Sequence, residues 1–274
     1  MADYKDDFKD RVVIVTGAGV GIGYALCKAF AAAGAKVVLN DLDPVLADES
    51  AKKLNAEFDD KRVQPYGLDV ADVNAVRRMV MDSAMRFGRL DVVIANAGIT
   101  NYGAFLDYHP ENFDRITSVN LRGTYFTAQA AAREMIRLNV TDGRILLTSS
   151  VTGVQGYPNL GAYGITKAGI IHMAKALALE LGEHGITVNA ISPGITATER
   201  TRADDPDLDA NWLGVLPNKR VGQVEDITAT ALFLASPGAR QINGQNIIVD
   251  GGWTQISPIP RESPTLPEVS SKLK

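Results

Sequence analysis

The segment TGAGVGIG, residues 16–23, limits the possible folds more than any other part of the chain, because it joins an apolar run to a helical pattern. Gly17, Gly21 and Gly23 stand in the spacing G-x-x-x-G-x-G. Glycines so placed allow a tight turn from a strand into a helix and let the backbone approach a pyrophosphate. The following helix offers free N–H groups and the positive end of its dipole to phosphates. The segment therefore predicts a strand–loop–helix unit that binds a dinucleotide; the alternative is a glycine-rich turn without a ligand.

Short runs rich in β-branched residues alternate with longer helical patterns along the chain. The runs span residues 11–17, 36–41, 62–67, 90–96, 143–149, 186–192 and 245–251. Several are apolar without interruption, as a strand covered on both faces requires. Strands that alternate with helices form right-handed βαβ units. The pattern predicts an α/β protein: a single-domain Rossmann fold with a doubly wound, seven-stranded parallel sheet and helices on both faces.

Three helical patterns have readable ends. They are residues 24–34 ending at Gly34, residues 44–58 beginning with Pro44, and residues 72–88 beginning at Asp72, a suitable N-cap, and ending at Gly88. We expect the dinucleotide-binding domain to cover residues 8–256. The segment 257–274 is rich in Pro and Ser, and we expect it to form an extended tail outside the core.

Composition and charge exclude several functional classes. The formal net charge of −4 and the pI of about 5.5 argue against a general nucleic-acid or anionic-membrane surface. The single cysteine, Cys27, excludes an internal disulfide framework and a CxxC metal site, and the histidines are not spaced as metal ligands. Apolar runs are too short to span a membrane, and the N-terminus lacks a signal-peptide core. We therefore expect no metal, no nucleic acid, no membrane partner and a cytoplasmic location.

Asp41 ends the second predicted strand, where an acidic side chain can accept hydrogen bonds from the adenosine ribose hydroxyls. A carboxylate at this place would repel a 2′-phosphate. No Arg or Lys stands within the glycine loop or directly after Asp41 to bind one. The sequence therefore favours NAD over NADP, and the alternative is that Asp41 only caps the turn into the next helix.

Tyr163 and Lys167 lie four residues apart on a predicted helix, so their side chains share one face. A free phenol has a pKa of roughly 10, and a nearby ammonium lowers it by stabilising the phenolate. A tuned phenol can take a proton from an alcohol or return one to a ketone. Ser150 ends the fifth predicted strand, where a hydroxyl can hold the reacting oxygen of a substrate. Such a pair alone is usually a solvated helix face, and it is the combination with Ser150 that indicates catalysis.

These segments together resemble a classical short-chain dehydrogenase/reductase over about residues 8–253. The matching segments are TGAGVGIG, Asp69-Val70, Asn96-Ala97-Gly98, VNLRG with Asn120, Ser150, Tyr163-x-x-x-Lys167 and Pro193-Gly194. The resemblance implies that Tyr163 is the acid/base, that Lys167 lowers its pKa and binds the nicotinamide ribose, and that Ser150 orients the substrate oxygen. It also implies that Asn120 kinks its helix and holds a water in a proton relay through Lys167.

The resemblance assigns further residues to the cofactor and the substrate. The expected cofactor residues are Gly17, Gly19, Gly21, Ile22, Gly23, Asp41, Asp69, Val70, Asn96, Ala97, Gly98, Tyr163, Lys167, Pro193, Gly194, Ile195 and Thr198. The expected substrate residues are Ser150, Thr152, Tyr157, Tyr163 and Gly194. The family is typically tetrameric or dimeric through the helices that precede and contain the Tyr–Lys pair, so a homotetramer or homodimer is expected.

The resemblance implies a small alcohol or carbonyl compound as the substrate, and two classes of such compounds fit the sequence. The expected pocket wall is polar, with Thr100, Asn101, Gln155 and Asn159, which favours a sugar or polyol oxidised with NAD. Apolar residues of the segment after Gly194, such as Trp212, fit a steroid-like or acyl ketone as the alternative. An alternative of another class is a non-catalytic, dinucleotide-binding regulatory protein, against which the intact Ser150, Tyr163 and Lys167 count.

Overall fold

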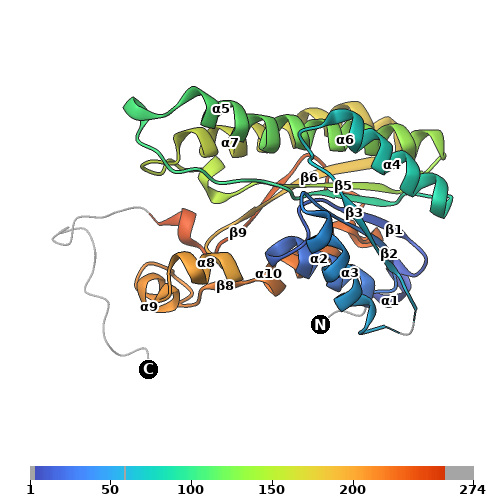
Figure 1. Ribbon diagram of the computed structural model, residues 1–274, viewed down its shortest axis with the longest axis horizontal. Coiled ribbons are helices and arrows are strands. Elements are labelled where there is room, and N and C mark those ends of the chain that lie inside the picture. The colour runs from blue at the N-terminus through green and yellow to red at the C-terminus, as the bar shows by residue number, and fades with distance from the viewer. Residues whose placement is uncertain (1–3, 59, 257–274) are drawn as a thin grey trace.

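A seven-stranded sheet runs through the centre of the computed structural model, which describes residues 4–58 and 60–256 (Figure 1). The strands are β1 (Val12–Val15), β2 (Lys36–Asp41), β3 (Val63–Gly67), β4 (Val92–Ala95), β5 (Gly143–Thr148), β6 (Ile186–Pro193) and β9 (Asn246–Val249). Their order is β3-β2-β1-β4-β5-β6-β9, and every neighbouring pair is parallel. The predicted seven-stranded parallel sheet is confirmed; six strands lie within the predicted runs, and β6 extends one residue beyond its run, to Pro193. The predicted tail, 257–274, lies outside the described residues.

Helices cover both faces of this sheet (Figure 1). One layer contains α4 (Val73–Phe87), α5 (Pro110–Thr117), α6 (Thr124–Arg137) and α7 (Gly161–Leu181). The other contains α1 (Lys5–Phe8), α2 (Gly21–Ala32), α3 (Pro44–Asn55) and α10 (Val224–Ala235). The fold is therefore doubly wound as predicted, and the connections from β1 and from β4 leave on opposite sides. A crevice opens at such a switch point, at the carboxyl ends of the strands.

Helix ends follow the local chemistry closely. The Asp72 side chain caps α4 by accepting hydrogen bonds from the amides of Asn74 (2.9 Å) and Ala75 (3.0 Å), and Gly88 ends the helix at φ 71°. Helix α2 begins at Gly21, three residues before the predicted start. The reason is that Gly21 adopts φ 59°, a left-handed conformation that turns the chain directly into the helix.

Two local features reduce the number of unpaired backbone groups along the outer edge of β3. Asn55 donates from its amide to the Val63 carbonyl (2.7 Å) and accepts from the Val63 amide (2.9 Å), so the backbone groups of Val63 face away from β2. Because alternate residues of a parallel strand face the same side, Pro65 also faces outward, where its missing N–H breaks no bond within the sheet.

Two features depart from a plain alternation of strand and helix. Residues Ser118–Gly123 form a π-helical turn between α5 and α6, and Asn120 lies within it. A small two-stranded sheet pairs β7 (Thr196–Ala197) with β8 (Gly222–Gln223), and the chain between them carries α8 (Glu199–Asp204) and α9 (Leu208–Leu213). Among the described residues, no helix is long and apolar enough to cross a membrane.

The core beneath the α2 face includes Phe30, which is fully buried and meets Phe8 edge to face at a centroid distance of 5.0 Å. Replacing Phe30 by Ala should lower the free energy of unfolding by about 3–5 kcal/mol, because it leaves a cavity in a packed core. Leu179→Ala is the matched control, since that side chain is 86% exposed; its effect should stay within about 0.5 kcal/mol. Chemical denaturation of both variants measures the difference, and equal losses would contradict the packing described.

Candidate active site

The glycine loop leaves no room for side chains on its inner side. A Cβ at Gly23 would lie 2.2 Å from the Gly17 carbonyl oxygen, and one at Gly17 would lie 2.6 Å from Ala97 Cα. At Gly21 the nearest neighbour of a Cβ is a methyl of Thr198, 3.6 Å away. The loop thus exposes its backbone on the side of Thr198, which caps α8. This cradle fits the pyrophosphate of a dinucleotide.

The carboxylate of Asp41 lies at the end of β2 and accepts a hydrogen bond from the Gly19 amide at 2.9 Å. Ser50 of α3 donates to the Gly19 carbonyl at 2.8 Å. The loop and the end of β2 are therefore held together from both sides. Ile22 is half-buried in the first turn of α2, behind this loop.

Asn96 fastens the end of β4 to the same loop. Its side-chain amide donates to the carbonyls of Thr16 (3.1 Å) and Gly17 (2.9 Å) and its Oδ1 accepts from Thr148 Oγ1 (3.2 Å). The Thr16 hydroxyl accepts from the amides of Asn96 (3.0 Å) and Ala97 (3.1 Å). The ends of β1, β4 and β5 thus form one hydrogen-bonded group at the switch point.

A cleft of about 310 Å³ lies beside this group. Its lining includes Gly17, Asp41, Asp69, Val70, Asn96, Ala97 and Gly98, which are seven of the predicted cofactor residues. The Asp69 carboxylate forms an ion pair with Arg115 of α5 at a distance of 3.0 Å. The structure therefore brings these residues together around one opening, and the set fits the adenosine half of a dinucleotide.

Lys167 is buried, with 3% of its surface exposed, and its Nζ donates to the Thr148 carbonyl at 2.8 Å. The Ser149 hydroxyl donates to the Lys167 carbonyl at 2.8 Å, so backbone and side chain are both fixed. Nζ lies 5.5 Å from the centroid of the Tyr163 ring. Burial lowers the pKa of Lys167 from 10.5 to about 8.

Tyr163 lies beside Ser150, as predicted. Burial raises the pKa of the Tyr163 phenol, while hydrogen bonding to Ser150 and Thr100 and the charge of Arg200 on α8 act to lower it. Lys167 is not among the groups that change this pKa, so the expected lowering of the phenol pKa by Lys167 stays a prediction. Ser150 itself accepts a hydrogen bond from the Thr152 amide at 3.2 Å.

Asn120 is fully buried in the π-helical turn. It accepts from the Ile99 amide (2.9 Å) and donates to the Ile99 carbonyl (3.0 Å) and to Thr166 (3.1 Å). A Cβ at Gly98 would lie 3.4 Å from both Asn120 Oδ1 and Lys167 Nζ, so both side chains lie next to this glycine. The expected kink at Asn120 is present as an irregular helical turn.

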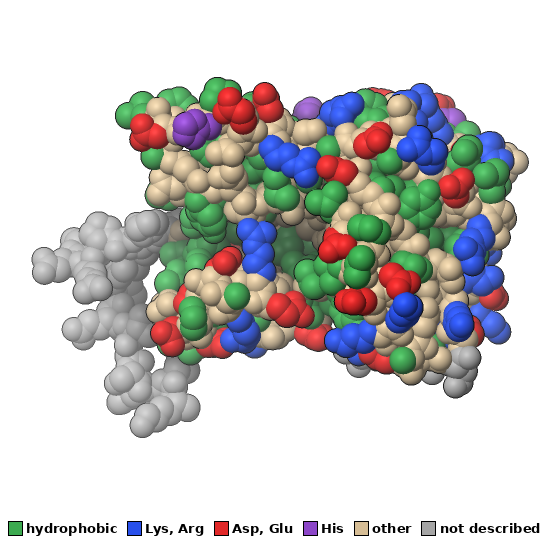
Figure 2. All heavy atoms as spheres, in the orientation of Figure 1, with side chains coloured by type: hydrophobic (Ala, Val, Ile, Leu, Met, Phe, Trp, Pro, Cys, Tyr) green, Lys and Arg blue, Asp and Glu red, His purple; other side chains and the backbone are tan. Residues whose placement is uncertain are grey.

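The wall expected for the substrate comes from three segments. Tyr157 accepts from Gln155 Nε2 at 3.1 Å and packs against Trp253, which packs in turn on Trp212 of α9, at centroid distances of 5.3 and 4.8 Å. The Thr152 hydroxyl is buried and has no partner among the described side chains and backbone. Figure 2 shows a hollow with hydrophobic side chains between the layer of α5 and α7 and the part that carries α8 and α9.

The end of β6 directs the chain toward this hollow. Pro193 is the last residue of β6 and is buried, and the Gly194 amide donates to the Val249 carbonyl at 2.9 Å. A Cβ at Gly194 would lie 2.7 Å from the side chain of Asp250, so only glycine fits. Ile195 follows, half-buried, and packs against the buried cluster of Ala197, Leu208, Leu216 and Val221, as Trp212 and Trp253 also do.

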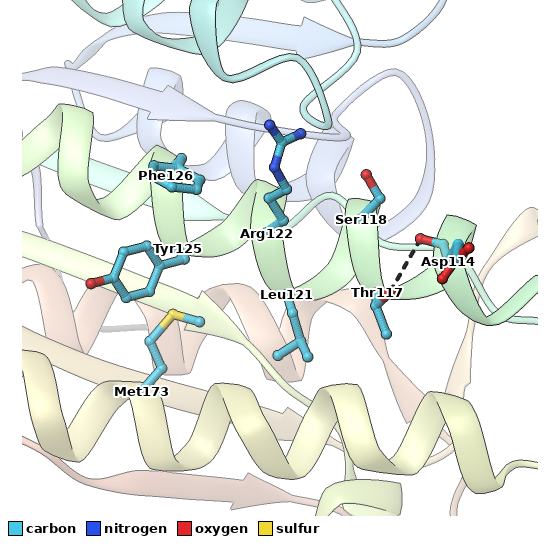
Figure 3. Close-up of a pocket in the computed structure, with 8 residues that line it drawn as sticks. All are labelled: Asp114, Thr117, Ser118, Leu121, Arg122, Tyr125, Phe126 and Met173. Carbon is cyan, nitrogen blue, oxygen red and sulfur yellow. Dashed lines mark hydrogen bonds between the residues drawn. The ribbon is translucent and has the colours of Figure 1, made fainter.

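A separate hollow of about 480 Å³ lies on the outer surface of the helices that precede and contain the Tyr–Lys pair. Figure 3 shows Leu121 pointing toward α7, and Met173 of α7 extending toward the Tyr125 ring. Tyr125 is 43% exposed. This is the surface on which the sequence predicts contact between subunits.

Sequence reasoning missed the threonines that support the site. Thr16, Thr148 and Thr166 hold Asn96, Lys167 and Asn120, respectively. Thr16 and Thr148 stand at the ends of two predicted strands. That position, at the edge where the site forms, was the sequence signal that could have identified them. Among the described residues, no group of three or more His, Cys, Asp or Glu could hold a metal ion.

Comparison with known proteins agrees with this geometry. A family model described as enoyl-(acyl carrier protein) reductase matches residues 17–254. The chain is 36% identical over 246 residues to an L-rhamnose-1-dehydrogenase of Scheffersomyces stipitis, covering 88% of this chain and 95% of that one. It is 36% identical over 244 residues to the 3-oxoacyl-(acyl-carrier-protein) reductase FabG of Staphylococcus aureus, covering 88% and 97%. A short-chain type dehydrogenase/reductase of Mycobacterium marinum superposes with a TM-score of 0.84 at 33% identity, covering 90% and 97%.

The lowered pKa of Lys167 makes stability depend on pH. Between about pH 8 and 10.5 the unfolded chain keeps the lysine proton while the folded chain releases it, so the contribution of Lys167 to stability rises with pH across that window. Lys167→Met should therefore be most stabilising relative to wild type below pH 8, and this advantage should shrink toward pH 10.5. Thermal unfolding across pH measures it.

Lys175→Met is the control, because Lys175 lies on the same helix and is exposed. The difference in stability between Lys175→Met and the wild-type protein should not change over the same pH window. An offset for Lys167→Met that is equally flat would contradict the burial of a charged amine.

Proposed function

Since the chain belongs to the classical short-chain dehydrogenase/reductase family of oxidoreductases, we propose that it transfers hydride between a secondary alcohol and NAD. The observation that carries the proposal is the meeting of Ser150, Tyr163 and the buried Lys167 at the carboxyl end of β5, next to the glycine loop. The nicotinamide, when bound, supplies the hydride acceptor or donor. All proton chemistry is left to the protein.

Tyr163 takes the proton from the substrate hydroxyl during oxidation and returns it to the carbonyl oxygen during reduction. The Ser150 hydroxyl holds that same oxygen, since it lies next to the phenol. Lys167 keeps its positive charge at neutral pH, because its pKa of about 8 is still above 7. Its ammonium favours the phenolate and binds the nicotinamide ribose. Asn120, which Ile99 and Thr166 hold in place, would bind the water of a proton relay through Lys167.

The cofactor residues divide between the two halves of the dinucleotide. Gly17, Gly19, Gly21 and Gly23 receive the pyrophosphate, and Asp41 receives the adenosine ribose. Pro193, Gly194, Ile195 and Thr198 receive the nicotinamide end. Support for NAD comes from the Asp41 carboxylate, which the Gly19 amide holds at the end of β2 and whose negative charge would repel a 2′-phosphate.

We favour a sugar or polyol as the substrate. The wall near Tyr163 is polar: Thr100 lies beside the phenol, Gln155 and Tyr157 are hydrogen-bonded to each other, and the Thr152 hydroxyl lacks a partner among the described residues. Rotation of Thr152 would offer its hydroxyl to a substrate hydroxyl, which satisfies both groups. The relative named L-rhamnose-1-dehydrogenase supports this choice.

A steroid-like or acyl ketone is the second candidate. It is favoured by the aromatic contacts among Tyr157, Trp212 and Trp253 and by the relative named as a 3-oxoacyl reductase. The candidate from another class, a non-catalytic dinucleotide-binding regulator, would have no use for the buried charge of Lys167. We also propose that the subunits meet through the hollow of Figure 3, as a homodimer or homotetramer.

Tyr163→Phe removes only the proton-transferring oxygen, so NAD reduction with any active sugar, polyol or secondary alcohol should fall by about 10²- to 10⁴-fold. Optical measurement of NADH across a substrate panel gives the rates, and NAD affinity should change little. Tyr102→Phe is the control, because that exposed side chain lies outside the catalytic group. Full activity of the Tyr163→Phe variant on any substrate would refute the assignment.

The wild-type protein should bind NAD at least about tenfold more tightly than NADP, a difference of about 1.4 kcal/mol. Asp41→Asn keeps an acceptor for the Gly19 amide but removes the charge, so the preference should narrow. Titrations of NAD and NADP with each protein provide the two Kd values. Asp82→Asn on α4 controls for loss of a negative charge elsewhere. A wild-type preference for NADP would overturn the role given to Asp41.

A further inference from the structure

An apolar groove of about 540 Å³ lies outside the catalytic group, between the segment that leads into α5 and the start of α7. Its side chains include Phe105, Tyr108, Phe113, Tyr157, Ala162 and Ile165. Phe105 is 92% and Ile165 58% exposed, so large apolar surfaces face outward here. Exposed aromatic clusters of this kind mark binding surfaces. The groove has aromatic side chains from three separate segments of the chain.

The groove also has an acidic rim. Asp114 lines it, and Asp107 and Glu111 are exposed on the same segment. Figure 2 shows acidic side chains gathered over the end of the molecule that carries α5. An occupant should therefore combine apolar residues with a positive charge.

The described chain ends beside the wall of this groove. Trp253 packs on Tyr157 at a centroid distance of 5.3 Å, and Tyr157 lines the groove. The Ile256 amide donates to the Trp253 carbonyl at 3.2 Å, so residue 256 lies one turn from that contact. Figure 1 shows the final turn, Trp253–Gln255, next to the loop before α7. The segment that follows therefore starts within a few residues of the groove.

We propose that residues 257–274 bind in this groove of their own chain. The segment contains Pro258, Pro260, Pro264 and Pro267, with Ile259, Leu266 and the positive Arg261 among them. Proline-rich segments bind aromatic-lined grooves as extended left-handed helices at low entropic cost. Ile259 and Leu266 would supply the apolar contacts, and the three basic residues of the segment, Arg261, Lys272 and Lys274, outnumber its two acidic residues, Glu262 and Glu268. This binding site for the tail does not depend on the oxidoreductase proposal.

Disulfide trapping tests this placement. The first variant combines Gly161→Cys with Ser263→Cys, because Gly161 lines the groove and a Cβ there meets nothing within 4 Å. The control combines Gly214→Cys with Ser263→Cys; a Cβ at Gly214 is equally free, and Gly214 lies near Trp212, which also contacts Trp253. Cys27 is buried and stays out of the exchange.

Under mild oxidation the groove pair should close about tenfold faster than the control pair, because binding raises the local concentration of the tail cysteine at the groove. The product should run as a monomer on a non-reducing gel. Adding Phe105→Ser should slow the groove pair several-fold and leave the control pair unchanged. Equal rates for the two pairs, or crosslinks formed only between chains, would overturn the proposal.

Discussion

The rest of the site depends on the burial of one ammonium group. Lys167 is held out of water by the packing of α7 on the sheet, and its bond to the Thr148 carbonyl and the nearby face of the Tyr163 ring compensate part of the lost hydration. Burial of an unpaired charge is costly, so the surrounding structure must be stable enough to support it. The ends of β1, β4 and β5 provide this support through Thr16, Asn96 and Thr148.

The same burial has opposite effects on the two members of the pair. It lowers the pKa of Lys167 and raises that of Tyr163, since it disfavours the charged form of each. The hydroxyls of Ser150 and Thr100 counteract it at the phenol. The pKa of Tyr163 is thus set by two opposing effects, desolvation and hydrogen bonding. A substrate oxygen that binds to the phenol must replace one of those hydroxyls as its hydrogen-bond partner.

Most of the fold and the location of the candidate site could be predicted from two properties of the sequence. These are the pattern of apolar residues along each segment and the position of polar residues at the ends of the predicted strands. Unbroken apolar runs such as Val12–Val15 indicate buried parallel strands, and residues at the ends of such strands meet at one edge. The irregular turn at Asn120 follows from the family resemblance but from no local pattern, because its hydrogen bonds reach Ile99 and Thr166. The early start of α2 depends on the left-handed conformation of Gly21, and the raised pKa of Tyr163 depends on burial. Neither property leaves a periodic pattern in the sequence.

The sealed edge at β3 has a consequence for how copies of this protein can assemble. Asn55 occupies the outward backbone groups of Val63, and Pro65 has no donor to offer, so a strand from another molecule finds no template there. Of the two edges of the seven-stranded sheet, these residues leave β9 as the open one. Growth of an open-ended intermolecular β-sheet requires an accessible edge on both sides of each molecule. Asn55, Val63 and Pro65, which lie outside the catalytic group, therefore disfavour such growth.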